Sequence, residues 1–61
     1  MDSIGQMIVK IGALVGTKDL TEWEDGFVRN IVERSHEGKV TTTLTNKQVE
    51  IVERIHKKLF A

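Results

Sequence analysis

The chain of 61 residues contains no cysteine, no proline and only three aromatic rings, one tryptophan and two phenylalanines. Without cysteine it has no disulfide, no thiolate metal ligand and no cysteine nucleophile, and this absence fits a reducing compartment. The absence of proline favours a chain built mostly of helix, because proline interrupts helical hydrogen bonding. A chain this short supports one core, so we expect residues 1–61 to form a single small helical domain.

Nine basic and nine acidic side chains cancel, so the chain has no formal net charge at pH 7. No overall field therefore attracts it to nucleic acid or to an anionic membrane, and any such binding must come from local clusters of charge. Its longest stretch of low charge, residues 11–17, is much shorter than the roughly 20 apolar residues that span a bilayer. We therefore expect a soluble, cytoplasmic protein with no membrane contact and no secretion signal.

The first predicted helix runs from Ser3 to Val15, within an N-terminal segment 1–16. Asp2 or Ser3 can cap its amino end, and Gly16 marks its expected stop. Its apolar surface is wider than a single stripe and therefore requires cover on more than one side. We expect this helix to contact a partner protein or a second copy of the chain; the alternative is that it closes a monomeric three-helix bundle. The residues assigned to partner binding are Ile4, Gly5, Ile8 and Gly12, the glycines because they let another backbone approach closely.

The second and third predicted helices begin with the same capping pattern. A threonine and a glutamate or glutamine three residues later can each accept a hydrogen bond from the backbone N–H of the other. The pairs with this spacing are Thr21 with Glu24 and Thr45 with Gln48. Gly38 is the expected end of the second helix. Residues 39–43 are the expected connection, because threonine and valine disfavour helix there.

The last two helices also repeat one another in sequence. Residues 20–21 recur at 44–45, and residues 31–36 recur with small changes at 51–56. The first copy is four residues longer, about one helical turn, so the two apolar stripes stay nearly in register. The predicted fold is therefore all-α: an N-terminal apolar helix followed by an antiparallel helix-loop-helix hairpin over 20–61. The predicted core residues are Ile8, Ile11, Trp23, Phe27, Ile31, Val49, Val52, Ile55 and Leu59.

The sequence contains few residue patterns that are typical of a catalytic site. There is no glycine-rich phosphate loop, no nucleophile motif and no pair of carboxylates at a spacing typical of an active site. His36 and His56 are the only imidazoles, and two histidines without cysteine or a convergent carboxylate make a poor metal site. His56 falls in the apolar arc of its helix, where it is interpreted as a partly buried histidine rather than a proton-linked switch. We expect no enzyme activity, no metal and no cofactor.

Two features of the sequence are compatible with binding. Trp23 and Phe27 can stack on bases or anchor a partner protein, although residues at this spacing on an apolar face are more often core. A row of basic residues on the third helix can follow a phosphate backbone, giving weak and salt-sensitive binding; the alternative is an ordinary solvated face. The residues assigned to nucleic-acid binding are Lys47, Arg54, Lys57 and Lys58.

A longer pattern runs through the last two helices. Residues 20–28 read LTEWEDGFV and residues 44–48 read LTNKQ, with an I-x-x-K-like tail within 51–58. This pattern resembles the small helix-loop-helix accessory domain associated with the UvsW-type phage recombination helicase, and similar short domains in phage DNA-metabolism proteins. The resemblance leaves the first helix outside. It implies a bacteriophage protein that works near DNA replication or recombination in the infected bacterial cell, beside a larger enzyme, and it transfers no catalytic residue.

Two functions follow as hypotheses. The first is an accessory module that binds nucleic acid weakly or docks on a DNA-processing protein. The alternative is a host-takeover or anti-defence inhibitor, a small protein that binds a host protein through an apolar face. A basic surface outside the core favours the first function, and a large exposed apolar patch with acidic edges favours the second.

Overall fold

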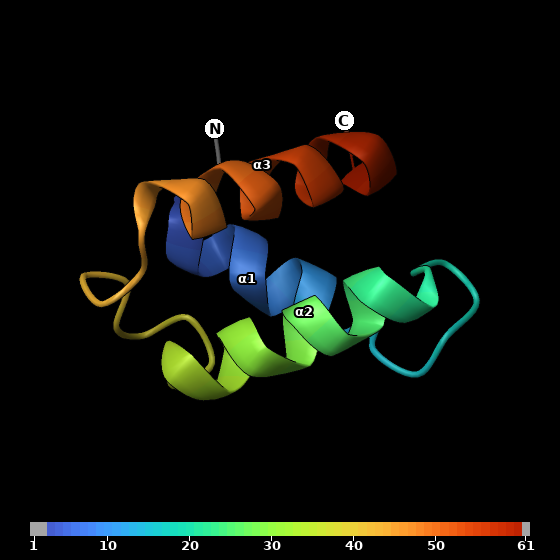
Figure 1. Cartoon of the computed structure of the whole chain (residues 1–61), viewed down its shortest axis with the longest axis horizontal. Helices are drawn as coiled ribbons and strands as arrows, with labels where there is room; N and C mark the ends of the chain where they lie inside the picture. The colour runs from blue at the N-terminus through green and yellow to red at the C-terminus, as the bar shows by residue number, and fades with distance from the viewer. Residues whose placement is uncertain (1–2, 61) are drawn as a thin grey trace.

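The computed structural model describes residues 3–60, which fold into three helices with no strand among them (Figure 1). Helix α1 spans Ile4–Gly12, α2 spans Glu22–Arg34 and α3 spans Asn46–Phe60. The predicted all-α class and three-helix arrangement are confirmed. No helix in this part of the chain is long and apolar enough to cross a membrane.

All three helices begin at the predicted caps. At each start a hydroxyl oxygen accepts a hydrogen bond from the backbone N–H three residues later, and the side chain of that later residue accepts one in return. These reciprocal bonds satisfy N–H groups that have no partner inside the first turn of a helix. Asp2, the other candidate cap of α1, lies outside the described residues. The pairs are Ser3 with Gln6, Thr21 with Glu24 and Thr45 with Gln48.

The carboxyl ends of the first two helices come earlier than the sequence predicted. Helix α1 ends at Gly12, and the chain continues in turns until Gly16, where φ is +84°. Helix α2 ends at Arg34 rather than at Gly38. Three consecutive residues there, 36–38, have left-handed backbone angles, with φ between 50° and 89°. Because such angles cannot continue a right-handed helix, they turn the chain back toward α1.

Helix α1 lies between the other two helices. It contacts both α2 and α3 more extensively than these contact each other. Helices α2 and α3 run in opposite directions on either side of it (Figure 1). The predicted antiparallel order of α2 and α3 is therefore present. However, α2 and α3 pack mainly against α1 and make only a small contact with each other.

The core lies where the three helices meet. Five of the predicted core residues are fully or almost fully buried, and three others are half-buried. The prediction for Trp23 is wrong, because 62% of its surface is exposed. Val28 and Ile31 occupy the centre of the buried side of α2, which turns Trp23 to the flank that α1 does not cover. The buried apolar residues are Met7, Ile8, Ile11, Leu20, Val28, Ile31, Val52 and Ile55; the half-buried residues from the prediction are Phe27, Val49 and Leu59.

Candidate binding face between α2 and α3

One flank of α2 carries a stacked pair of aromatic rings, one exposed and one half-buried. Trp23 and Phe27 lie one turn apart and stack with their planes nearly parallel and offset, with ring centroids 5.4 Å apart and an angle of 8° between the ring planes. Phe27 is half-buried against the core, so it supports the more exposed indole. Asn30 and Arg34 continue the same row, because residues three and four positions apart lie above one another on a helix.

A row with the same spacing runs along α3. It contains Lys47, Ile51, Arg54 and Lys58. The ammonium nitrogen of Lys58 lies 3.1 and 3.2 Å from the two carboxylate oxygens of Glu24 on α2. Since a helical row keeps to one side of its helix, this contact places the row on the side of α3 that is next to α2.

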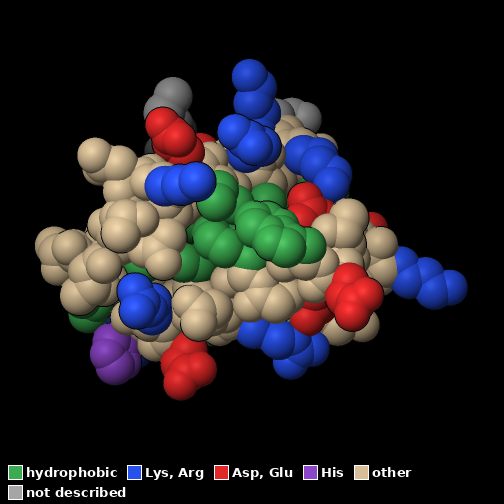
Figure 2. All heavy atoms as spheres, in the orientation of Figure 1, with side chains coloured by type: hydrophobic (Ala, Val, Ile, Leu, Met, Phe, Trp, Pro, Cys, Tyr) green, Lys and Arg blue, Asp and Glu red, His purple; other side chains and the backbone are tan. Residues whose placement is uncertain are grey.

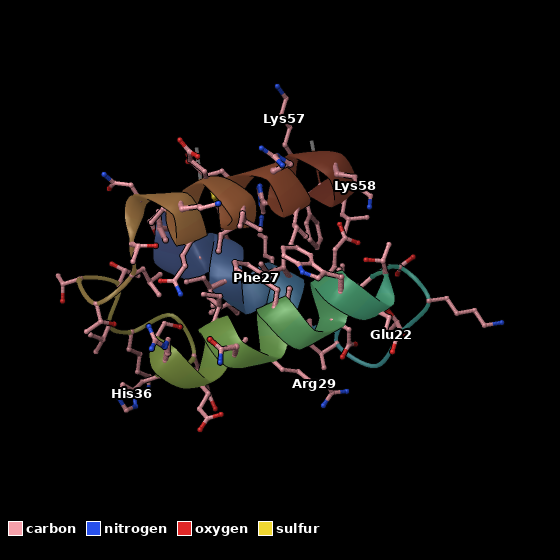
Figure 3. The ribbon with its side chains drawn as sticks, in the orientation of Figure 1. Glu22, Phe27, Arg29, His36, Lys57 and Lys58 are labelled. Atoms are coloured by element: carbon pink, nitrogen blue, oxygen red, sulfur yellow. The ribbon has the colours of Figure 1, made fainter. Side chains whose placement is uncertain are left out.

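The two rows together form one surface, which we call the aromatic–basic face. In Figure 2 a continuous apolar patch lies between α2 and α3, and Lys and Arg side chains gather along its α3 side. Phe27 points into the space between the two helices (Figure 3). The face consists of Trp23, Phe27, Asn30 and Arg34 from α2, and Lys47, Ile51, Arg54 and Lys58 from α3.

The acidic group nearest to this face is already engaged. Glu24 accepts a hydrogen bond from the backbone N–H of Thr21 at 2.9 Å, and its side chain is only 13% exposed. That backbone hydrogen bond, and then Lys58, lower the pKa of the Glu24 carboxyl below its ordinary value of 4.5. One of the four cations of the two rows, Lys58, is therefore paired with a carboxylate that is itself held in the cap of α2.

The other acidic groups at the start of α2 lie away from the face or at its end. Asp25 accepts hydrogen bonds from Arg29 and from the backbone N–H of Gly16. These two bonds, that from Arg29 first, lower the pKa of its carboxyl below 3.8. Glu22 lies at the amino end of α2, beyond the end of the row (Figure 3). The negative charge of α2 is thus concentrated at its first turn.

The structure brings together three of the four residues predicted to bind nucleic acid. Lys57 does not share the face, because its side chain points away from α2 (Figure 3). Arg34 is the residue that sequence analysis missed. A signal for it was present, because Arg34 stands as far from its cap Thr21 as Lys58 stands from its cap Thr45. The sequence alone does not show that Arg34 belongs to the face. That becomes clear only when α2 and α3 are placed antiparallel.

The residues predicted to bind a partner through α1 are mostly used inside the chain. Gly5 packs against the backbone of Gly38, so closely that a β-carbon at Gly5 would lie 2.4 Å from the Gly38 carbonyl oxygen. A β-carbon at Gly12 would lie 3.0 Å from a methyl group of Val32. The predicted close approach of two backbones exists, but it is intramolecular. Ile8 is fully buried, as the core prediction has it, and Ile4 is half-buried against the core; their assignment to partner binding stays a prediction.

A shallow depression remains on the outer side of this contact. It has a volume of about 460 Å³ and runs along α1 beside the left-handed turn. Val9, which is 58% exposed, is the apolar side chain among the residues that line it. Its rim carries charges of both signs, from Lys10, Glu37 and Lys39.

The two histidines lie on different elements of the structure. His36 is exposed on the left-handed turn, whereas His56 is half-buried and stacks on Phe60 with ring centroids 5.3 Å apart. Within residues 3–60, no three histidine, aspartate or glutamate side chains converge as a metal site would require. Neither histidine contributes to the aromatic–basic face.

No protein-family model, curated protein or solved structure matches this chain. The chemistry of the aromatic–basic face must therefore be inferred from its own residues.

Proposed function

We propose that the protein is a non-catalytic accessory module that binds nucleic acid through the aromatic–basic face. The observation that carries the proposal is the alignment of Arg34, Lys47, Arg54 and Lys58 on the two helical rows that also carry the stacked Trp23–Phe27 pair. Guanidinium and ammonium groups along a helix can contact successive phosphates. Exposed aromatic rings beside them add a surface on which bases can stack. The combination suits nucleic acid better than either feature alone.

Binding of this kind is weak and depends on salt. The chain has no net charge, so the attraction arises only where the four cations lie together. Four phosphate contacts predict that the logarithm of the binding constant falls with the logarithm of salt concentration with a slope of about −3. The resemblance to phage accessory domains supports a place beside a replication or recombination enzyme in the cytoplasm of an infected bacterium. In that setting a larger enzyme would supply the remaining affinity.

Fluorescence anisotropy of a labelled DNA oligonucleotide tests the proposal. The triple variant Lys47→Glu, Arg54→Glu, Lys58→Glu is expected to abolish binding at low salt. Its matched control reverses three cations outside the face, Lys18, Lys39 and Lys57, and therefore changes the net charge equally. The control is expected to retain most of the affinity. Equal loss in both variants, with both still folded by circular dichroism, would show that only net charge matters and would contradict the proposal.

The apolar part of the same face favours a second candidate function. An exposed apolar patch often marks a protein contact, and this patch contains Trp23, a residue type that is frequent at the centre of protein interfaces. The alternative is therefore an inhibitor that binds a host protein. It predicts no nucleic-acid binding at any salt concentration, together with loss of host-protein binding in Trp23→Ala but not in the triple charge variant.

Pairing of two copies through α1 is a separate proposal about partners. Exposed Val9 and a rim with charges of both signs suit a two-fold contact, in which basic and acidic groups can exchange across the axis. Sedimentation equilibrium at high micromolar concentration tests it, with Val9→Lys as the disrupting variant. Unlike Ile8, Val9 can be changed without entering the core. A monomer mass for the unaltered chain would refute pairing.

A further inference from the structure

We infer that the nucleic acid is single-stranded and that one unpaired base stacks on the outer face of the Trp23 indole. This inference rests on the proposed function and adds the class of nucleic acid and the point where a base is held. It is carried by the geometry of the Trp23–Phe27 pair and by the width of the two-helix face.

The indole of Trp23 is a rigid platform. Part of one of its faces overlaps Phe27 in an offset stack with an angle of 8° between ring planes, and Phe27 is in turn packed against the core. The first turn of α2, which carries Trp23, is fixed by the reciprocal hydrogen bonds of Thr21 and Glu24. Because 62% of Trp23 is exposed, the opposite face of the indole can receive another flat ring. A base there would become the third ring of a stack that already contains Trp23 and Phe27.

The shape of the face disfavours a duplex. A helix with its side chains is about 10 Å wide, so two helices side by side present a surface about twice that width. The major groove of B-DNA is only about 12 Å wide and admits one helix. A duplex could thus meet the whole width of this surface only with its phosphates, because its bases are stacked inside. An unpaired strand can lie flat on the surface and turn a base toward Trp23.

The charges indicate where the strand lies. Lys58 binds Glu24, the residue that follows Trp23, so its ammonium group is close to the start of the α2 row. Glu22 lies beyond that point, at the amino end of α2, and makes that end acidic (Figure 3). Phosphates would therefore extend from Trp23 toward the other cations of the face, and Trp23 would mark one end of the path.

The single tryptophan of the chain makes the inference directly measurable. Three ligands of equal length are compared at low salt: oligothymidylate, a DNA duplex, and an abasic strand that keeps the phosphates and lacks the bases. Oligothymidylate is expected to quench Trp23 fluorescence and to bind about tenfold more tightly than the abasic strand, as loss of one stacked base predicts. Trp23→Ala should remove that tenfold difference, read by anisotropy of a labelled strand. Trp23→Phe should retain part of it.

Phe60→Ala is the matched control. Phe60 is also an exposed aromatic residue, 43% accessible, but it lies on α3 near Lys10 of α1 and outside the aromatic–basic face. Its removal should leave the preference for oligothymidylate unchanged. Equal affinity of all three ligands without quenching would overturn this inference while leaving the proposed function in place. Failure of all three to bind would overturn the proposed function and the inference with it.

Discussion

Two regions of this small protein use surface in opposite ways. At the junction of α1 with the turn after α2, two glycines bring their backbones into direct contact, with no side chain between them. At the aromatic–basic face, large side chains stand beside one another, and 62% of the Trp23 surface is exposed although Phe27 stacks against it. An added side-chain atom in the first region would collide with backbone, whereas side-chain atoms can be removed from the second region without leaving a cavity in the core. Substitutions in the two regions should therefore affect different properties, stability in one and binding in the other.

The junction depends on a turn that is costly by itself. His36 and Glu37 adopt positive φ angles, and this left-handed conformation costs a residue that has a side chain roughly 1–2 kcal/mol. Ser35, fully buried, holds the turn in place: its hydroxyl donates a hydrogen bond to the carbonyl of Ile31 at 2.6 Å and accepts one from the N–H of Gly38 at 3.0 Å. The hydrogen bonds of Ser35 thus hold Gly38 in the position in which its backbone contacts Gly5.

The largest expected effect follows from filling the junction. Gly5→Ala would place a methyl group 2.4 Å from the carbonyl oxygen of Gly38, so α1 and the turn must separate. We expect a loss of about 3 kcal/mol, at the upper end of the cost of overpacking. A chain of this size has a total stability of only about 3–9 kcal/mol. Urea denaturation followed by circular dichroism measures the change.

Gly26→Ala is the control for this substitution. Gly26 lies in the middle of α2, and a β-carbon there would meet no atom within 4 Å. Alanine favours helix over glycine by about 1 kcal/mol, so this variant should gain stability. If Gly5→Ala were as stable as Gly26→Ala, the close packing of the junction would be disproved.

Removing the hydroxyl that supports the turn should have the next largest effect. Ser35→Ala leaves the N–H of Gly38 without its acceptor in a partly buried place, and we expect a loss of about 1–2 kcal/mol. Thr17→Ala is the comparison, because the Thr17 hydroxyl donates a similar 2.6 Å bond to the carbonyl of Leu14 at the surface. Water can replace that exposed bond, so its loss should be much smaller. Equal losses in the two variants would argue against a special role for Ser35.

The features that sequence analysis predicted correctly are those decided within a few residues. A capping box is satisfied inside one helical turn, so Ser3, Thr21 and Thr45 could be identified without knowledge of the rest of the fold. The row of Lys47, Arg54 and Lys58 likewise follows from helical spacing alone. Helical periodicity identified most of the core for the same reason.

The features that it missed depend on contacts between distant segments. Apolar residues cover a broad arc of α2, and the sequence does not say which edge of that arc the neighbouring helices leave open; the open edge is the one with Trp23. The glycines of α1 indicated a close backbone contact, but its partner, Gly38, is 33 positions from Gly5 along the chain. Arg34 joined the candidate site only once α2 and α3 were placed antiparallel.

Trp23→Ala tests the other side of the comparison. A buried tryptophan would cost about 3–5 kcal/mol when truncated. Here the exposed indole stabilises the fold mainly through its stacking on Phe27, so we expect a loss of about 1 kcal/mol. Ile31→Ala, in the core, should lose at least 2 kcal/mol. A loss in Trp23→Ala as large as in Ile31→Ala would show that the indole is covered in solution, and the face would not be available for binding.

The smallest expected effect on stability belongs to Glu24→Gln, which is also the change that separates stability from binding. Glutamine keeps the capping bond to Thr21 and removes the ion pair with Lys58, whose side chain is 52% exposed. The loss at pH 7 should therefore be below about 1 kcal/mol. Nucleic-acid affinity should rise, because Lys58 no longer faces a carboxylate.

The pH dependence of this pair sharpens the same test. The pKa of Glu24 is lowered in the folded protein, by the Thr21 N–H first and by Lys58 next, so its contribution to stability is present above its ordinary pKa of 4.5 and is lost as the pH falls through the lowered value. Protonated Glu24 resembles glutamine. The stability difference between the unaltered chain and Glu24→Gln should consequently shrink in urea titrations at pH 3 compared with pH 7. A difference that stays constant with pH would mean that the carboxylate charge contributes nothing. A fall in affinity in Glu24→Gln would mean that Lys58 needs Glu24 to hold it on the face, rather than being restrained by it.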